Sequence, residues 1–483
     1  MKNFLKIFLL GGIFFLGSAQ IIFAESLKLN LNDAINYALK NNRTIEQSAD
    51  DREAARWNLS AARRSFGPTL SWSSSANRIG GRYYNGARDA RELFDTVPEE
   101  YRPYYGLTDN IADYPKYESE NTNSVSFSFP LYSGGRLESQ KESAEFSLNA
   151  ADLILENTRQ EIKYQTSQAF FQVMQYKNLM NVRQEEMKNL SEHLETVKIQ
   201  YEVGTVAMSD FLATNVQLAN SQQSYNSTQI NYENAIANLN NLIGLPVETN
   251  LVIDEELRYS PFNKDEESCL EYALSHRPDG IAADFSVKSY EAAVNQAKAD
   301  ARPNISAVVS GSISGEGAFK ADHTSGAERW AAGLEMRWNI FDNNVTSAQV
   351  NRAKILQKKA ESQAQQQIEQ IQLEVHNAYA ALRISERNVK LSEETIKQAQ
   401  EQYLIAKVRY EEGVDTNLIV MDAQEKLTQA QTNYFSALYS YNTSKAQLEK
   451  AMGIPIEIDA ELYQKAVESG KISKKALEIS KVE

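Results

Sequence analysis

The sequence predicts an α+β fold, mainly α, in which long coiled-coil helical hairpins and membrane-spanning strands are written twice along one chain. Two ungapped internal alignments carry this prediction. Residues 127–246 align with residues 336–455, and residues 37–39 align with residues 272–274, where both segments read Tyr-Ala-Leu. A repeat of this size means that each half uses the same helices and strands in the same order.

The alignments divide the chain into a first structural repeat at residues 25–246, a second repeat at residues 247–455 and a C-terminal tail at residues 456–483. Residues 1–24 have the pattern of a secretory signal peptide, in which lysines precede an apolar run and the small residue Ala24 closes the segment. We therefore expect export and cleavage. An uncleaved membrane anchor is the alternative.

Composition and net charge limit the kinds of partner and of covalent cross-link that the protein can have. The 483-residue chain carries a formal net charge of −14, which disfavours nucleic acid as a partner. A hydrophobic share of 42% fits an ordered protein. Cys269 is the single cysteine, so an intrachain disulfide is excluded.

Four segments alternate apolar residues with serine or other polar residues, which predicts strands near residues 69–79, 123–132, 304–314 and 329–341. Each is close to the ~9 to 11 residues that a tilted strand needs to cross a bilayer. A soluble, half-exposed sheet would show the same alternation. The apolar positions of the second segment are Val125, Phe127, Phe129 and Leu131.

Four strands cannot close a wall by themselves. They leave two open edges that lipid cannot satisfy, and small closed barrels need about 8 strands. Three copies would supply 12 strands, an even number within the range of such barrels (about 8 to 26 strands). The sequence thus predicts that chains pool their strands in a membrane, as three copies could, with the connection at residues 80–122 as a loop at the membrane surface.

Heptad patterns predict long helices near residues 141–202 and 350–411. Each would span about 90 Å at 1.5 Å per residue. Shorter helices are expected near residues 31–43 and 264–275. The heptad positions of the second long helix are Ile368, Val375, Leu382, Val389, Ile396 and Tyr403, interleaved with Ile371, Ala378, Ser385, Ser392, Ala399 and Ala406. Those of the first are Val173, Met180, Met187, Leu194 and Tyr201, interleaved with Ile162, Ala169, Tyr176, Leu190 and Val197.

Glycines punctuate these helices at matching places in the two repeats. Gly204 and Gly413 predict the turns at the tips of two helical hairpins, and Gly244 and Gly453 predict the ends of the returning helices. Each repeat therefore attaches one hairpin to one pair of strands, so the helices are expected to continue the barrel on one side of the membrane.

The order of these elements and the tip sequences YEVGT at residues 201–205 and YEEGV at residues 410–414 resemble the TolC-like outer-membrane efflux proteins, also called outer membrane factors. The resemblance covers nearly all of the chain after the signal peptide. It implies a trimer whose 12-stranded β-barrel continues into an α-helical barrel across the periplasm. It also implies docking on a periplasmic adaptor, or membrane fusion protein, and through it on an inner-membrane transporter.

The resemblance assigns adaptor contact to the tips. Val203, Gly204 and Thr205 match the tip motif of the family. At the second tip Gly413 is retained, but its neighbours depart from the motif, which leaves contact there open.

The resemblance also implies a gate made of polar links between the two hairpins. Asp210 and Tyr410 match one linking pair, and Ser209 stands for the threonine of another. Asp415 occupies the position of the arginine in that second link, so the link cannot form as it does in the family.

A ring of aspartates at the closed end is the other implied part of the gate. Asp422 is retained, while Ile419 replaces the second aspartate. Three Asp422 carboxylates near one axis would favour bound cations and exclude anions. The alternative is an ordinary solvated acid on a helix surface.

An enzyme is not expected, because the histidines show no ligand spacing and no glycine-rich phosphate loop follows a strand. The sequence predicts neither a metal site nor a cofactor.

The leading function is a trimeric outer-membrane channel-tunnel, the exit duct of a tripartite efflux pump or a type I secretion system. The alternative is a non-conducting structural or adhesive coiled-coil surface protein. The sequence does not choose among drug, metal and protein as cargo. The histidines are His193, His276, His323 and His376.

Overall fold

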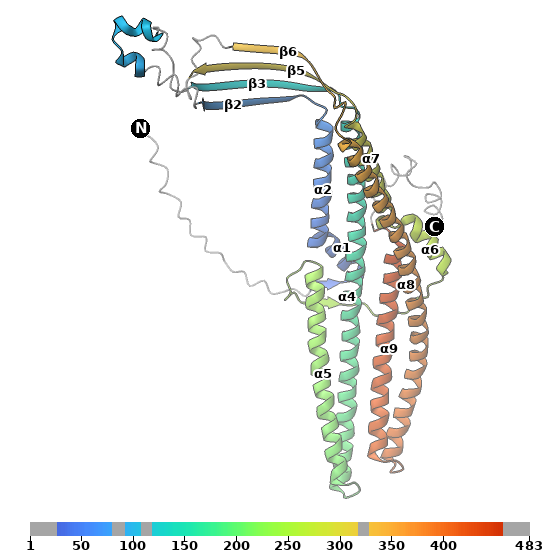
Figure 1. The fold of residues 1–483 in the computed structure, drawn as a ribbon. Coiled ribbons are helices and arrows are strands. Elements are labelled where there is room, and N and C mark those ends of the chain that lie inside the picture. The colour runs from blue at the N-terminus through green and yellow to red at the C-terminus, as the bar shows by residue number, and fades with distance from the viewer. Residues whose placement is uncertain (1–26, 80–91, 108–117, 317–327, 457–483) are drawn as a thin grey trace. The chain divides into compact units, whose positions relative to one another are not determined.

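The computed structural model describes residues 27–79, 92–107, 118–316 and 328–456 of the chain. The expected signal peptide, two stretches of the connection at residues 80–122 and the tail after residue 456 lie outside the described residues. The fold is mostly helical with some sheet, which confirms the predicted class at that level (Figure 1).

Contacts divide the chain into two compact units, which we describe separately. Unit 1 comprises the residues up to Gln47, Glu156–Arg277 and the residues from Ile371 onward. Unit 2 comprises Ser48–Leu155 and Pro278–Gln370. The strand pairs belong to unit 2, and the tips of the helical hairpins belong to unit 1.

The two repeats have the same element order, strand, helix, helix, two strands, long helix and returning helix. The long helices α4 and α8 are each 67 residues long, and α2 and α7 are each 22 residues long. The first repeat consists of β1 (Leu27–Leu29), α1 (Leu31–Asn41), α2 (Arg43–Arg64), β2 (Thr69–Ile79), β3 (Glu118–Tyr132), α4 (Arg136–Glu202) and α5 (Met208–Leu242), with the 3-10 helix η1 (Glu99–Tyr105) between its strands. The second consists of β4 (Leu251–Ile253), α6 (Glu266–His276), α7 (Pro278–Ala299), β5 (Asn304–Glu316), β6 (Glu328–Arg337), α8 (Val345–Glu411) and α9 (Asn417–Met452).

Two pairs of elements were not predicted from the sequence. The helices α2 and α7 each follow a short helix almost at once, and the short strands β1 and β4 pair in parallel. In that pairing Leu27 lies opposite Leu251 and Leu29 lies opposite Ile253. The start of the first repeat is thereby joined to the start of the second within unit 1.

The fourth strand is shorter than predicted. It ends at Arg337, so Trp338 and Ile340 follow the strand instead of completing it. Asn343 and Asn344 then adopt left-handed backbone angles, a conformation that asparagine tolerates better than most residues. The carboxylate of Asp342 accepts a hydrogen bond from the backbone N–H of Thr346 at 2.7 Å and so caps the start of α8. This capped turn ends the strand before the apolar alternation ends.

The strands of unit 2 form an antiparallel sheet with the order β2-β3-β5-β6 (Figure 1). One face carries rows of serine across the strands, such as Ser71 opposite Ser126 and Ser126 opposite Ser310. The hydroxyls of Ser71 and Ser126 lie 2.7 Å apart. The other face carries apolar side chains, including Trp72 and Trp330. Within this sheet β2 and β6 each pair on one side only, so both edges present unpaired backbone groups.

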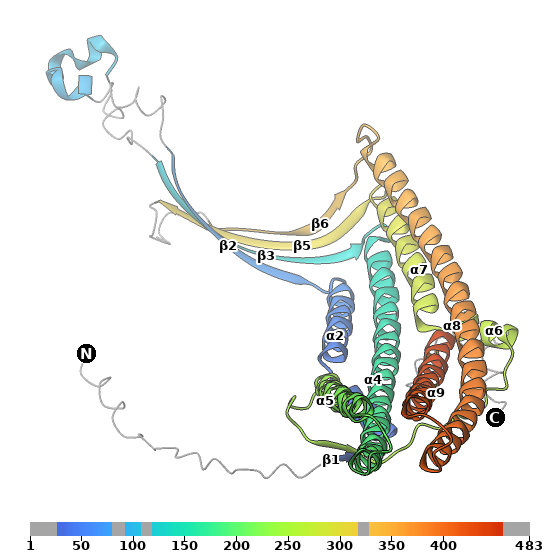
Figure 2. The ribbon, with the colours of Figure 1, turned by 90° about the horizontal axis from the view of Figure 1, so that it is seen from below.

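In unit 1, α5 lies beside α4 and α9 lies beside α8 (Figure 2). Burial confirms most of the predicted heptad of α8, since Val375, Leu382, Ala378 and Ala406 are buried, but Ile368 at its start is exposed. Fully burying a leucine or valine stabilises a fold by about 1.5–3 kcal/mol. Among the described residues, no helix has the length and apolarity that a membrane crossing needs.

The heptad predicted for α4 was partly wrong. Met180, Met187 and Leu194 are only partly buried. The buried stripe toward the tip runs through Val182, Glu186, Leu190, His193 and Val197, of which the predicted heptad contains only Leu190 and Val197. The ionisable residues Glu186 and His193 are thus buried at positions that the predicted heptad does not include.

The returning helices end at glycines that other segments of unit 1 approach closely. Gly244 has a φ of +76°, and a Cβ placed on it would lie 2.7 Å from the Cβ of Asn41. Gly453 has a φ of +71°, and its Cβ would lie 2.9 Å from the Cγ of Arg277. These glycines are needed both for backbone conformation and for the close approach of a neighbouring chain segment.

We predict that Gly244→Ala destabilises the protein more than Gly204→Ala does. Both glycines are left-handed, but nothing lies within 4 Å of a Cβ at Gly204. Gly204→Ala should therefore cost only the backbone term, about 1–2 kcal/mol. Gly244→Ala should add about 1–3 kcal/mol of overpacking against Asn41. Thermal unfolding in detergent measures the difference, and equal midpoints for the two variants would contradict the packing at Asn41.

Candidate functional site at the hairpin tips

Both hairpins turn through the same backbone motif. At the first tip the N–H of Thr205 donates to the carbonyl of Gln200 at 2.9 Å, and the N–H of Gly204 donates to the carbonyl of Tyr201 at 3.0 Å. At the second tip Val414 and Gly413 make the equivalent bonds at 2.8 and 3.0 Å. This is the Schellman arrangement, which ends a helix at a left-handed glycine and satisfies its last carbonyl groups.

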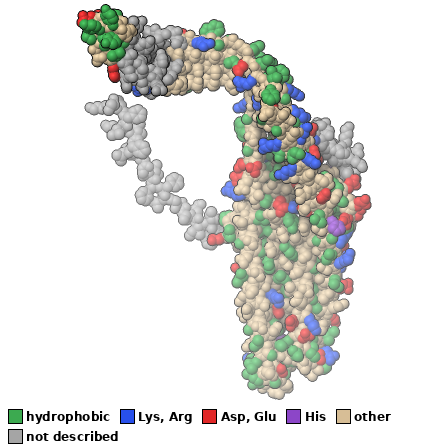
Figure 3. Space-filling view, viewed as in Figure 1, with side chains coloured by type: hydrophobic (Ala, Val, Ile, Leu, Met, Phe, Trp, Pro, Cys, Tyr) green, Lys and Arg blue, Asp and Glu red, His purple; other side chains and the backbone are tan. Residues whose placement is uncertain are grey.

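The outer surfaces of the tips are apolar. Val203 is 70% exposed and Val414 is 64% exposed, and Leu418 at the start of α9 is also exposed. Hydrophobic side chains gather at this end of the hairpins (Figure 3). Scattered exposed apolar residues are ordinary, but a concentration at two turns marks a surface suited to another protein. This is the surface that the sequence assigned to adaptor contact, through Val203, Gly204, Thr205 and Gly413.

The two hairpins are joined close to the tips by the side chain of Asn417. Its Nδ2 donates to the carbonyl of Asp210 at 3.2 Å and to the hydroxyl of Thr214 at 3.0 Å, both on α5. Its Oδ1 lies 2.6 Å from Nε2 of His193 on α4. Asn417, Thr214 and His193 are all buried. One asparagine of the second hairpin is therefore bonded to both helices of the first.

An apolar cluster surrounds this polar group. It is built on Val197, Tyr410 and Val420, against which partly buried side chains pack from the first hairpin and from α8. The ring of His193 meets the ring of Tyr410 edge to face, with centroids 5.0 Å apart. Contacts of this geometry are favourable for aromatic pairs. The partly buried members of the cluster are Val206, Phe211 and Tyr403.

Asp210 and Tyr410, the predicted linking pair, lie near one another, but the structure shows no hydrogen bond between their side chains. The hydroxyl of Tyr410 is buried and has no hydrogen-bond partner among the described residues. Burial raises the pKa of Tyr410, and the negative charge of Asp210 raises it further. Ser209, the residue predicted for the other link, is exposed at the start of α5.

Asp415 forms a tie within its own hairpin. Its carboxylate accepts two hydrogen bonds from the guanidinium of Arg409, at 2.8 and 3.2 Å. The sequence showed that Asp415 replaces a basic residue of the resembled family, and the structure shows what the replacement binds. A bidentate pair of this kind fixes both side chains across the turn at Gly413.

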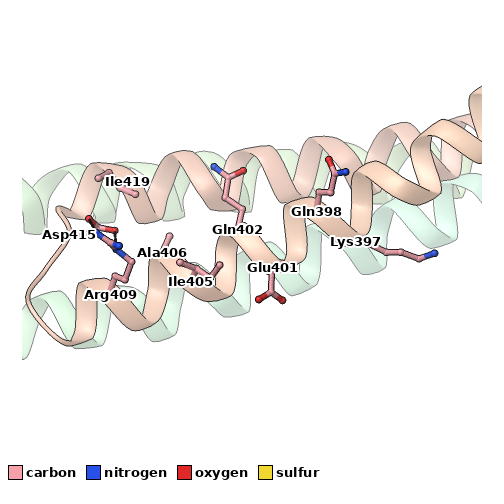
Figure 4. Close-up of a pocket in the computed structure, with 9 residues that line it drawn as sticks. All are labelled: Lys397, Gln398, Glu401, Gln402, Ile405, Ala406, Arg409, Asp415 and Ile419. Carbon is pink, nitrogen blue, oxygen red and sulfur yellow. Dashed lines mark hydrogen bonds and ion pairs between the residues drawn. The ribbon is translucent and has the colours of Figure 1, made fainter.

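Asp422, the predicted ring residue, is exposed on α9 and pairs with Lys426 one helical turn away at 2.7 Å. The neighbouring Ile419 lines a groove of about 700 Å³ between α8 and α9 (Figure 4). Figure 4 shows the Arg409–Asp415 pair at the tip end of this groove. The groove is lined by Lys397, Gln398, Glu401, Gln402, Ile405, Ala406, Arg409, Asp415 and Ile419.

Above the tips, polar side chains continue to join α4 to α9. Asn189 donates to Gln424 at 3.1 Å, and Gln175 donates to Ser436 at 3.3 Å. A hydrogen bond of this type contributes about 0.5–1.5 kcal/mol net. The contact between the hairpins therefore depends on several modest polar bonds as well as on apolar packing.

His193, Thr214 and Asn417 were missed as site residues. The usable signal was the position of His193, which falls between Leu190 and Val197 on the buried stripe of α4. A histidine on an apolar stripe requires a polar partner. Nothing in the sequence indicated that Asn417 is that partner. Among the described residues no group of His, Cys, Asp and Glu side chains has the arrangement of a metal site.

Comparison with known proteins identifies the group to which this architecture belongs. The family model described as outer membrane efflux protein matches residues 34–245 and 269–454. Among curated proteins, the antibiotic efflux pump outer membrane protein ArpC of Pseudomonas putida is 22% identical over 424 residues, covering 88% of this chain and 82% of that protein. The alkaline protease secretion protein AprF of Pseudomonas aeruginosa is 21% identical over 450 residues, covering 92% and 89%.

Solved structures share the fold at low sequence identity. The CmeC outer membrane channel of Campylobacter jejuni superposes with a TM-score of 0.73 at 18% identity, covering 92% of this chain and 90% of that chain. The outer membrane protein VceC of Vibrio cholerae gives a TM-score of 0.70 at 18% identity, covering 88% and 97%.

We predict that Tyr410→Phe leaves stability unchanged or raises it by up to about 1 kcal/mol, because it removes a buried hydroxyl that has no partner. A hydrogen bond from this hydroxyl to the carboxylate of Asp210 would give the opposite result, a loss of about 1.5–3 kcal/mol. Denaturant unfolding of both proteins distinguishes the two outcomes. A clear loss of stability in Tyr410→Phe would contradict the unpaired hydroxyl.

Proposed function

Because this chain belongs to the outer membrane efflux protein family, we propose that it forms a trimeric outer-membrane channel-tunnel, the exit duct of a tripartite efflux pump or a type I secretion system. ArpC is named for antibiotic efflux and AprF for protease secretion, so both kinds of cargo occur among its relatives. The inner-membrane partner supplies the energy in this proposal, and the duct itself carries out no chemistry.

The observation that carries the proposal is the incomplete sheet of unit 2. Its edge strands β2 and β6 have unpaired backbone groups, which are costly in the absence of water. Its faces differ as the wall of a pore requires, with exposed Trp72, Trp330 and Leu334 on one and hydroxyl rows on the other. Three copies joined edge to edge would close 12 strands with the apolar face toward lipid.

The helices of unit 1 support the same assembly. The helix α8 has an exposed apolar row at heptad spacing, formed by Ile384, Leu391 and Ile405. The helix α5 has exposed Leu212 and Val216 and contains no basic residue. We propose that the first hairpin of one copy covers the groove of Figure 4 on the next copy, in the manner of a coiled coil.

The gate in this proposal is the set of contacts at the tips. The domain division predicted from the sequence places one tip in each repeat, near Gly204 and Gly413. The predicted gate residues are Asp210, Tyr410, Ser209 and Asp422, to which the structure adds the Arg409–Asp415 tie. Movement of the hairpins apart would break the bond of Asn417 to the carbonyl of Asp210 and the contact of the Tyr410 ring with His193. The exposed tips, with Val203, Gly204, Thr205 and Gly413, would meet the periplasmic adaptor. The chain itself would reach the outer membrane through its signal peptide and leave its helical part in the periplasm.

We predict that the purified protein produces single-channel current steps in planar bilayers and that Asp415→Asn raises the open fraction a few-fold. The substitution removes the charge that holds Arg409 across the turn, and partly exposed pairs of this type have modest effects. Arg43→Gln is the matched control, because it breaks the exposed ion pair to Glu46 on α2, outside the proposed gate, and should leave the open fraction unchanged.

Absence of current in the wild type and in both variants would overturn the duct and would favour a structural or adhesive coiled-coil protein. Equal responses of the two variants would leave the duct intact but would contradict the role of the Arg409–Asp415 tie.

A further inference from the structure

His193 is a buried titratable group at the junction between the hairpins. Its side chain is 6% exposed, and it lies on α4 between the apolar cluster at Val197 and the polar contacts farther along the helix. The ring makes an edge-to-face contact with Tyr410 of α8 and a hydrogen bond to Asn417 of α9. It therefore touches both helices of the second hairpin from one helix of the first.

The hydrogen bonds of Asn417 determine which ring nitrogen of His193 carries the proton. The amide nitrogen of Asn417 already donates to Asp210 and Thr214, so its Oδ1 is the acceptor toward His193. Nε2 of His193 must then carry the proton and donate across 2.6 Å. The neutral ring makes this bond with Nδ1 unprotonated. A second proton would place a positive charge in an apolar cluster.

Charged groups on the surrounding helices act on that second proton in opposite directions. From α8, Lys407 repels it and Glu411 attracts it, but Lys407 also forms an ion pair with Glu192 of α4 at 3.6 Å. From α5, Asp210 contributes its carbonyl to Asn417, and its negative charge acts on Tyr410. From α9 the facing group is the uncharged Asn417, and Asp415 just before α9 is occupied by Arg409. Burial lowers the pKa of His193, and the hydrogen bond to Asn417 opposes that effect.

We propose that His193 and Asn417 form a proton-sensitive latch that holds the two hairpin tips together while the imidazole is neutral and releases them when it is protonated. This proposal rests on the proposed gate at the tips, and it adds that external acidity acts as a signal to that gate. The members of the latch are bonded across 224 positions of sequence, so the contact exists only when the hairpins are closed.

The sign of the pH effect follows from burial. In the closed arrangement the pKa of His193 lies below its ordinary value of about 6.5, which the residue regains when the hairpins separate and water reaches it. The closed state therefore binds fewer protons, and it loses stability relative to the open state as pH falls below about 6.5. Each pKa unit between the two states changes the equilibrium about tenfold per chain.

The test measures the distance between the tips directly. Spin labels at Val203→Cys and Val414→Cys, both exposed, report the distance between the tips of the two hairpins of one chain. The native Cys269 is fully buried and stays unlabelled. Labelled chains are diluted with unlabelled chains, so that one labelled copy is observed at a time. Between pH 7.5 and pH 5, the population with a longer distance should increase in wild-type protein, by up to about tenfold for each unit by which the pKa of His193 differs between the two states.

His193→Gln is the decisive variant, because its amide can donate to Asn417 but does not titrate. Its distances should be independent of pH over the same range. His376→Gln is the matched control, since His376 is exposed and contacts Glu266 away from the tips, and it should respond as the wild type does.

The latch is overturned if wild-type distances do not change with pH, or if His193→Gln changes as the wild type does. A wild-type distance that does not change with pH overturns the latch even if a variant fails to fold. Because distances are measured without current, a protein that does not conduct would overturn the exit duct and still report on the latch.

Discussion

The constraint on which the rest of the structure depends is the unpaired backbone at the two edges of one sheet. In water, the open edges of β2 and β6 would be a tolerable risk of aggregation. In hydrocarbon each unpaired N–H or carbonyl costs several kcal/mol, so a four-stranded sheet with one apolar face is stable only when other copies complete it. In the proposed trimer, the apolar row on α8 and the surface of α5, a helix without basic residues, would face other copies.

The contacts between the hairpins combine hydrogen bonds with apolar packing. Asn189 of α4 donates to Gln424 of α9, and Val197, Tyr410 and Val420 form an apolar cluster nearer the tips. Each hydrogen bond contributes about 0.5–1.5 kcal/mol net, so these bonds can be broken one at a time. In the proposed gate, movement of the hairpins would also have to separate the apolar cluster.

Much of the fold could be predicted because its signals are local. Gly204 and Gly413 mark turns that require left-handed backbone, and the heptad of α8 is continuous in sequence. The helices α2 and α7 carry no such stripe. In α7 the buried residues Ala282, Phe285 and Ala292 become a face only when neighbouring helices cover them. Elements of that kind depend on tertiary packing, which the sequence does not display.

The candidate site was harder to predict than the fold, because its parts meet only in three dimensions. The resemblance to a family pointed to Asp210 and Tyr410, yet in this chain Asn417 binds the carbonyl of Asp210, and the ring of Tyr410 packs on His193. The buried bond joins His193 of α4 to Asn417 of α9, and the sequence of neither helix indicates this pairing.

One measurement tests the central claim that the sheet of a single chain is only part of a closed β-barrel. A cysteine at Ser73 in β2 is combined in turn with cysteines at Arg329, Ala331 and Gly333 in β6, and the protein is oxidised in the outer membrane. The account predicts that one of these pairings yields covalent trimers, because β2 of one copy must lie beside β6 of the next. Folded protein that stays monomeric at every pairing, or that links into chains of unlimited length, would contradict it.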